Sequence, residues 1–195
     1  MKTLSIIQRE HRAIAAVVHC LDQLLREVRA GELDPPPFEV FELIATYMRD
    51  FPDQLHHPKE DDYLFPVLAK RAPELGTAFD LLRRQHVEGA KRTIDLLEKL
   101  EAYKQDPKTG FAAFDKAATE FIEFQREHLA FEESRVLPAA RESLTEVDWK
   151  AIDAAFAKND DPIFGDKPQS KFNKLFSRIV STAPEPWGLK ARGER

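Results

Sequence analysis

Four long stretches of this 195-residue chain carry apolar residues at alternating spacings of three and four. They span roughly residues 4–28, 38–71, 75–103 and 111–141. Such spacing places the apolar side chains on one face of an α-helix, which a globular protein buries. No stretch shows the sustained apolar-polar alternation of a β-strand. Because the links between the stretches are short, the sequence predicts an all-α fold, an up-down antiparallel four-helix bundle.

Extra helices are predicted beyond these four stretches. Thr145 and Asp148 are spaced as in a capping box, so a shorter helix should follow Thr145. A last amphipathic set consists of Phe172, Leu175, Phe176, Ile179 and Val180. We therefore divide the chain into a bundle, 1–142, and a C-terminal helical extension, 143–195. We expect the extension to pack on the bundle or on a partner subunit, which would make a homodimer.

Composition and charge exclude several classes of protein. The formal net charge is −5, so the chain as a whole offers no electrostatic attraction for nucleic acid or for an anionic membrane. Cys20 is the single cysteine, which excludes a disulfide framework and a thiolate metal site. We find no apolar run long enough for a signal peptide or a membrane span and no glycine-rich phosphate loop, so the expected location is the cytoplasm.

Three histidines stand where the apolar spacing calls for core residues. His11 fills the gap between Ile7 and Ile14 in the first stretch, and His86 and His128 fill the equivalent gaps in the third and fourth. A single buried histidine is more often a hydrogen-bonded structural residue than a metal ligand. Three of them on bundle-facing positions point instead to a shared polar centre.

An internal repeat adds a fourth histidine and two acids. Residues 54–66 read QLHHPKEDDYLFP and residues 126–138 read REHLAFEESRVLP, so laying His56 on His128 puts Glu60 on Glu132. Residues four apart lie on one helix face, so each His-x-x-x-Glu pair can reach one point. Two hairpins packed about a pseudo-two-fold axis bring together four imidazoles and two carboxylates: His11, His56, His86, His128, Glu60 and Glu132.

Metal ions account for carboxylates buried in a helical core. Unpaired, such charges would be very costly. Two divalent metals, each held by two histidines and bridged by both carboxylates, remove that cost, and this donor set suits iron, or less selectively manganese or zinc. His57 points about 100° away from its neighbour, and we expect it beside the ligands or on the surface. The same holds for Glu10, Asp61 and Glu133, and His19 is expected to be an ordinary helix residue.

The motif set resembles that of bacterial hemerythrin-like proteins of the HHE cation-binding family. The resemblance covers roughly residues 3–142 and rests on REHRAI, HHPKEDDYLFP, RRQHVEG and HLAFEESRVLP. It implies two non-heme irons (Fe2+/Fe3+), bridged by carboxylates and an oxo or hydroxo group. The four histidines would be iron ligands, and Glu60 and Glu132 would bridge. The family binds O2, and some members respond to nitric oxide, peroxide or iron itself.

Two departures from the oxygen carriers argue against simple reversible oxygen carriage. The carriers have a further histidine one helical turn after the first histidine of the second hairpin, where this chain has Ala90. Their last carboxylate is an Asp five residues after its histidine, whereas Glu132 stands at four. The expected ligand set therefore has four histidines rather than five.

Three functions remain open at this point. The first is an O2- or NO-binding protein for storage, delivery or sensing. The second is a di-iron peroxidase, a catalase-like enzyme or an iron-repair enzyme, and the third is a non-redox cation binder. A ferritin-like oxidase is excluded because it needs Glu three residues before two of its histidines. The residues at those places are Gln8, Asp53, Arg83 and Gln125.

Overall fold

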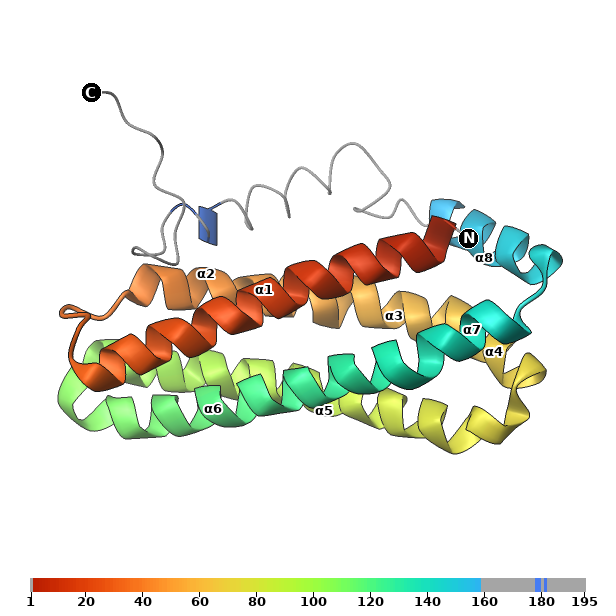
Figure 1. Cartoon of the computed structure of the whole chain (residues 1–195). Helices are drawn as coiled ribbons and strands as arrows, with labels where there is room; N and C mark the ends of the chain where they lie inside the picture. Colours follow the sequence, from red (N-terminus) through yellow and green to blue (C-terminus); the bar gives the residue numbers. More distant parts are fainter. Residues whose placement is uncertain (1, 159–177, 180, 182–195) are drawn as a thin grey trace, which may run out of the picture.

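The computed structural model describes residues 2–158, 178, 179 and 181, and the described chain is almost entirely helical (Figure 1). Its first helix is α1 (Lys2–Ala30). A second rod follows, consisting of α2 (Phe38–Met48), η1 (Arg49–His56), α3 (His57–Lys59), η2 (Glu60–Leu64) and α4 (Phe65–Arg71). After the short η3 (Pro73–Leu75) come α5 (Gly76–Gln105), α6 (Pro107–Phe131), η4 (Glu132–Val136), α7 (Leu137–Ser143) and α8 (Glu146–Lys158). The described residues contain no strand, which confirms the all-α prediction.

The long rods lie side by side along the molecule (Figure 1). Each rod returns alongside the one before it, and α6 packs against both α5 and α1. The rods are less regular than uninterrupted α-helices, because η1, η2 and η4 are π-helical. No helix in the described part of the chain is long and apolar enough to cross a membrane.

The end of α1 and the turn between α5 and α6 follow from local chemistry. Gly31 ends α1 with φ of 72°, a left-handed conformation that glycine adopts without steric cost. Between the third and fourth stretches, α6 begins at Pro107, directly after Asp106. The carboxylate of Asp106 accepts hydrogen bonds from the backbone N–H groups of Lys108 (3.1 Å) and Thr109 (3.4 Å). An Asp cap followed by proline is a strong helix start, so the turn shrinks to one residue.

Gly110 allows α5 and α6 to approach closely just after this turn. A Cβ atom there would lie 2.5 Å from Cα of Tyr103 and 2.8 Å from the carbonyl oxygen of Ala102. Because these are backbone atoms, we expect Gly110→Ala to lower the free energy of unfolding by about 3 kcal/mol. Gly76→Ala is the matched control, since nothing lies within 4 Å of its added methyl group. Urea unfolding should therefore show a change below about 1 kcal/mol for the control; equal losses for both variants would contradict this account.

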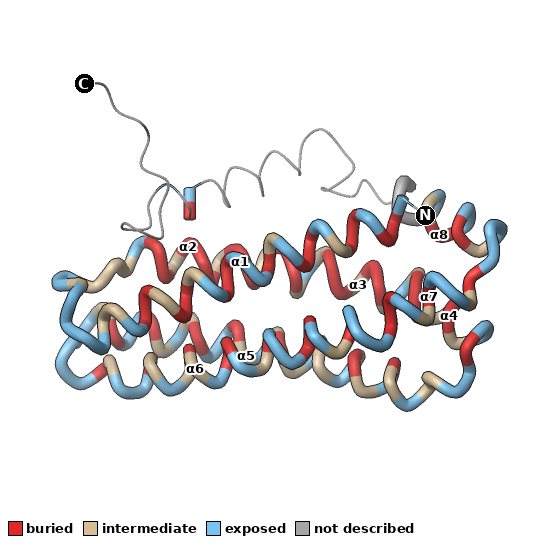
Figure 2. The backbone as a smooth tube through the Cα atoms, in the orientation of Figure 1, coloured by how far each residue is buried: buried red, intermediate tan, exposed pale blue. Residues whose placement is uncertain are grey.

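A polar layer divides the buried apolar side chains into two clusters. On α1, Leu4 and Ile7 belong to the cluster at the α4/α7 end, and Ile14 onward belongs to the cluster at the α1–α2 turn. On α5 the division falls between Leu82 and Leu96. Figure 2 shows the buried positions facing inward along every rod. The histidines predicted at core positions lie in the polar layer between these clusters.

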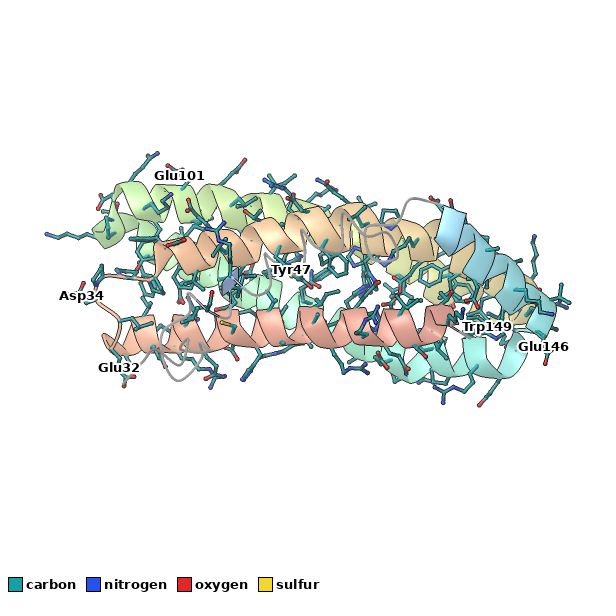
Figure 3. All side chains as sticks on the ribbon, turned by 90° about the horizontal axis from the view of Figure 1, so that it is seen from above. Glu32, Asp34, Tyr47, Glu101, Glu146 and Trp149 are labelled. Atoms are coloured by element: carbon teal, nitrogen blue, oxygen red, sulfur yellow. The ribbon has the colours of Figure 1, made fainter. Side chains whose placement is uncertain are left out.

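The extension packs on the bundle where the structure describes it. Trp149 and Ile152 of α8 are buried in the cluster at the α4/α7 end, opposite the turn at Glu32 and Asp34 (Figure 3). The predicted capping box is confirmed: Thr145 N–H donates to Asp148 (2.9 Å) and Asp148 N–H donates to Thr145 Oγ1 (3.2 Å).

A second contact of the extension lies near the start of α2. Ile179 is buried in the cluster at the α1–α2 turn, and Arg178 pairs with Glu39 at 3.3 Å. The other members of the last amphipathic set, Phe172, Leu175, Phe176 and Val180, lie outside the described residues.

Candidate metal centre

Both acids of the repeat begin a π-helical stretch that ends shortly before a proline. Glu60 opens η2, which is followed by Pro66, and Glu132 opens η4, which is followed by Pro138. Proline has no backbone N–H and its ring clashes with the carbonyl four residues earlier, so the preceding turn widens. Single π-turns of this kind are common at functional sites. The repeated apolar-apolar-Pro ending therefore shapes the turn that carries each glutamate.

The buried donor atoms form two groups. One contains His11, His56, Glu60 and Glu132, and the other contains His57, His86 and His128. Within each group, one ligand atom from every residue lies within 4.8 Å of the others. The six side chains predicted from the repeat are therefore brought together, and His57 joins them.

The two carboxylates lie between the groups. Oε1 of Glu60 is 3.6 Å from Nε2 of His56, and Oε2 of Glu60 is 3.8 Å from Nε2 of His86. Oε2 of Glu132 is 3.2 Å from Nε2 of His11 and 3.7 Å from Nε2 of His128. Two donors that each lie about 2.1 Å from one metal ion are roughly 3 to 4 Å apart. These separations fit carboxylates shared between two ions.

Buried atoms without a hydrogen-bond partner converge on the same centre. They include both carboxylate oxygens of Glu60 and of Glu132, and Nε2 of His86 and of His128. Leaving so many buried polar atoms unsatisfied would cost several kcal/mol. Coordination by metal ions satisfies them, so the residues present fit a two-metal centre.

His57 was expected beside the ligands or on the surface, and the structure places it beside them, in the core. The ring is buried and stacks on His86, with centroids 4.2 Å apart and an interplanar angle of 9°. The core-facing stripe of a bundled helix is more than about 100° wide, so two adjacent residues can both face inward. Here the π-helical η1 ends at His56 and re-aims the pair. His56 joins the group that contains His11 of α1, and His57 joins His86 of α5 and His128 of α6.

Four of the five histidines are held from behind by a hydrogen bond through Nδ1. His11 donates from Nδ1 to Glu133 (2.9 Å), and His56 donates from Nδ1 to Glu10 (2.6 Å). In the other group, His86 donates from Nδ1 to Asp61 (3.0 Å), and His128 donates from Nδ1 to Gln85 (3.1 Å). Nδ1 of His57 is 3.8 Å from Oδ1 of Asp53. An oxygen acceptor behind a ring fixes the tautomer and leaves the Nε2 lone pair for a metal. We expected Glu10, Asp61 and Glu133 beside the ligands or in solvent, and the contacts place them beside.

These supporting residues follow the internal repeat. Glu10 and Gln85 each precede the first histidine of a hairpin, and Asp61 and Glu133 each follow a shared glutamate. The sequence signal was therefore present, although Gln85 and Asp53 were not singled out from it. The halves differ in charge: Glu10 is also paired with the buried Lys59 at 3.3 Å, whereas Gln85 is neutral. The repeat thus replaces a carboxylate by an amide behind one ligand.

The two shared carboxylates differ in proton affinity. Burial and repulsion by Glu132 raise the pKa of Glu60 to about 7. For Glu132 burial acts in the same direction, but the close contact of its carboxylate with His11 outweighs it and lowers the pKa. Burial lowers the pKa of His11, but its close contact with Glu132 and its hydrogen bond with Glu133 raise it well above the ordinary value. In the metal-free chain, the positive charge of protonated His11 therefore balances the negative charge of one carboxylate. A bound metal ion would supply that positive charge instead.

Three imidazoles are held neutral. Burial lowers the pKa of His56 and His57 well below the ordinary value, and lowers that of His128 to about 4. A neutral imidazole is the form that binds metal. Two aromatic rings line the group of His57, His86 and His128: Phe65 stacks on His86 (5.9 Å) and Phe124 lies parallel to His128 (6.4 Å).

Comparison with known proteins agrees with this geometry. The uncharacterized proteins Rv1995 of Mycobacterium tuberculosis and Mb2018 of Mycobacterium bovis are each 26% identical to this chain over 170 residues. The matches cover 82% of this chain and 62% of each relative, so the chain spans less than two thirds of their length. No solved structure matches significantly. The hemerythrin HHE cation binding domain matches residues 2–140, most of the chain and all of the residues just described, and the chain belongs to this family.

Proposed function

We propose that this chain is a non-heme di-iron protein that binds O2 or a related small ligand, NO or peroxide, for storage or sensing in the cytoplasm. The bundle would be of the up-down four-helix type. The proposed iron ligands are His11, His56, His57, His86 and His128, with Glu60 and Glu132 shared between the two ions.

The observation that carries this proposal is the unequal division of imidazoles around shared carboxylates. Three imidazoles face one position and two face the other, while Glu60 and Glu132 face both. A centre that only stabilised the fold would be best served by closed coordination at both positions. The group with His11 and His56 has fewer protein donors and leaves more room for an exogenous ligand.

The chain's own residues would hold, orient and shield this centre. Imidazoles together with carboxylates suit iron. When bound, iron would supply the electrons that allow O2 or NO to bind reversibly. Glu10, Asp61, Glu133 and Gln85 orient the rings through Nδ1, and the negative charge of the three carboxylates would offset that of the ions. Phe65 and Phe124 exclude water from the three-histidine group.

The fifth imidazole alters the expectation drawn from Ala90. With four histidines, both positions would have been equally open, which favours irreversible chemistry. His57 supplies a further imidazole from the other hairpin, one helix away from where the carriers have theirs. The proposal therefore favours reversible binding over turnover of peroxide.

An anaerobic optical titration tests this function. Iron-loaded protein is mixed with O2, NO and peroxide in turn, and the spectrum is followed before and after the gas is removed. A charge-transfer band that appears with O2 and disappears on its removal is the expected result. Sustained consumption of peroxide without a stable adduct would instead select the peroxidase or catalase-like function, and absence of any response would leave a non-redox cation binder.

A further inference from the structure

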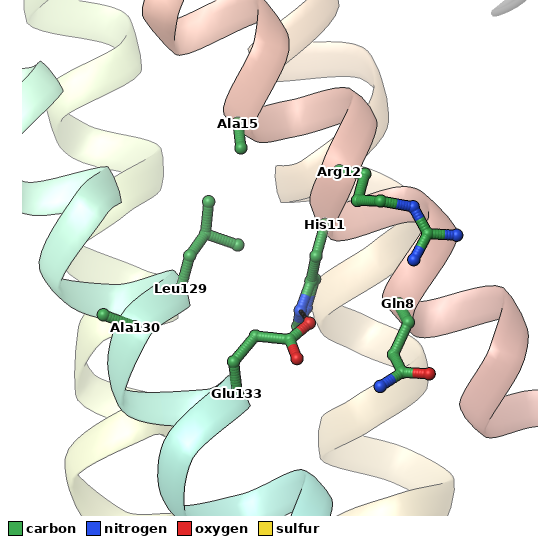
Figure 4. Close-up of a pocket in the computed structure, with 7 residues that line it drawn as sticks. All are labelled: Gln8, His11, Arg12, Ala15, Leu129, Ala130 and Glu133. Carbon is green, nitrogen blue, oxygen red and sulfur yellow. Dashed lines mark hydrogen bonds and ion pairs between the residues drawn. The ribbon is translucent and has the colours of Figure 1, made fainter.

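A pocket opens to solvent between α1 and α6, directly beside the two-histidine group. Its cavity volume is about 300 Å³. Gln8 and Arg12 of α1 line its polar side, while Ala15, Leu129 and Ala130 line its apolar side. His11 and Glu133 meet at its inner wall, where Figure 4 shows the carboxylate of Glu133 against the ring.

The internal repeat explains why the pocket lies beside the two-histidine group. In the register that lays His56 on His128, His57 falls on Leu129. In the first half His57 stacks on His86 and fills that position. In the second half the helix stays α-helical up to Phe131, and Leu129 lines the pocket beside His11 instead. The group with fewer imidazoles is therefore the group that the pocket reaches.

Glu133 covers His11 at the inner wall of the pocket. Its Oε1 accepts the Nδ1 hydrogen bond of His11 at 2.9 Å, and the His11 ring is only 3% exposed. The Glu133 side chain itself is 40% exposed, so it can swing toward solvent without disturbing the packed core. Its displacement would uncover the edge of a residue that belongs to the centre.

We propose that this pocket is the entry route by which a ligand of two or three atoms reaches the metal centre, and that Glu133 closes it. The inference rests on the proposed di-iron function. The small side chain of Ala15 keeps the mouth open, and Arg12 and Gln8 favour small polar or anionic ligands such as peroxide or azide.

Blocking the mouth tests the route in the full-length, iron-loaded chain. Ala15→Phe fills the pocket, and Ala16→Phe is the matched control, because Ala16 is the adjacent exposed alanine outside the lining. Iron per chain is measured first, and a chain that binds no iron refutes the proposed function whatever the route. With iron bound, stopped-flow mixing gives the rate constants for azide binding and release.

A blocked route raises the barrier in both directions and leaves the affinity unchanged. We expect Ala15→Phe to lower both rate constants about tenfold, a barrier higher by about 1.4 kcal/mol, with the same Kd. Ala16→Phe should change neither rate by more than about twofold. Unchanged rates in Ala15→Phe, or a weaker Kd with an unchanged binding rate, would overturn the entry route.

A second experiment tests Glu133 without metal. Diethyl pyrocarbonate modifies accessible imidazoles, and peptide mass spectrometry reports each histidine separately. In the metal-free chain, Glu133→Ala should raise the modification rate of His11 about tenfold, since its cover is gone. Glu133→Gln, which keeps a side chain of the same length over the ring, should raise it much less. Equal His11 modification in wild type and Glu133→Ala would show that Glu133 is not the closing residue.

Discussion

Replacing His57 with alanine is expected to reduce bound iron from about two ions per chain to about one. His57 is one of only three imidazoles in its group, and its ring also supports His86 by stacking. Loss of a supporting partner alone costs about 10- to 100-fold in metal affinity, and loss of a ligand should cost more. Metal analysis after equilibration with a weak chelator measures the remaining iron.

The matched control for this substitution is His19→Ala. His19 is an exposed histidine on α1, outside both donor groups. It should keep the iron content of the wild-type chain. His56→Ala removes an imidazole from the other group and should also lower the iron content. Full occupancy in His57→Ala would show that this buried ring is structural and that the centre uses four histidines.

Replacing Glu60 with glutamine is expected to have opposite effects with and without metal. Burial and the charge of Glu132 raise the pKa of Glu60 from 4.5 to about 7, so the folded chain binds this proton more tightly than the unfolded chain. The stabilisation from that proton is complete below pH 4.5 and is lost as the pH rises through 7. The loss is of the order of 3 kcal/mol, and glutamine, which does not ionise, avoids it.

Urea unfolding at pH 8 and at pH 5 measures both halves of this prediction. In the presence of a chelator, Glu60→Gln should be the more stable protein at pH 8, and the difference should shrink at pH 5. With iron, the order should reverse, because a neutral amide compensates less of the metal charge. Asp62→Asn is the control, since Asp62 is exposed in the same π-helical stretch. A variant that is less stable than wild type in both states would contradict the shared role of Glu60.

The sequence alone determined which elements form and which side chains have the right periodicity to meet. The three-four spacing marked the helices, and the 72-residue repeat paired His56 with His128 and Glu60 with Glu132. Both signals are local, because a regular helix repeats its faces every three or four residues. The start of α6 at Pro107 could also have been read from Asp106, a strong cap.

Only the tertiary structure decided how the donors divide. Periodicity gives an angle about a single straight helix axis, and that angle turned His57 away from His56. In the folded chain η1 changes the direction of the helix, and a partner on another helix, His86, lies within stacking distance. The hydrogen bond between His128 and Gln85, and the pocket beside His11, likewise depend on distances between helices. Such distances are set by packing of side chains far apart in the chain, so no spacing along the sequence contains them.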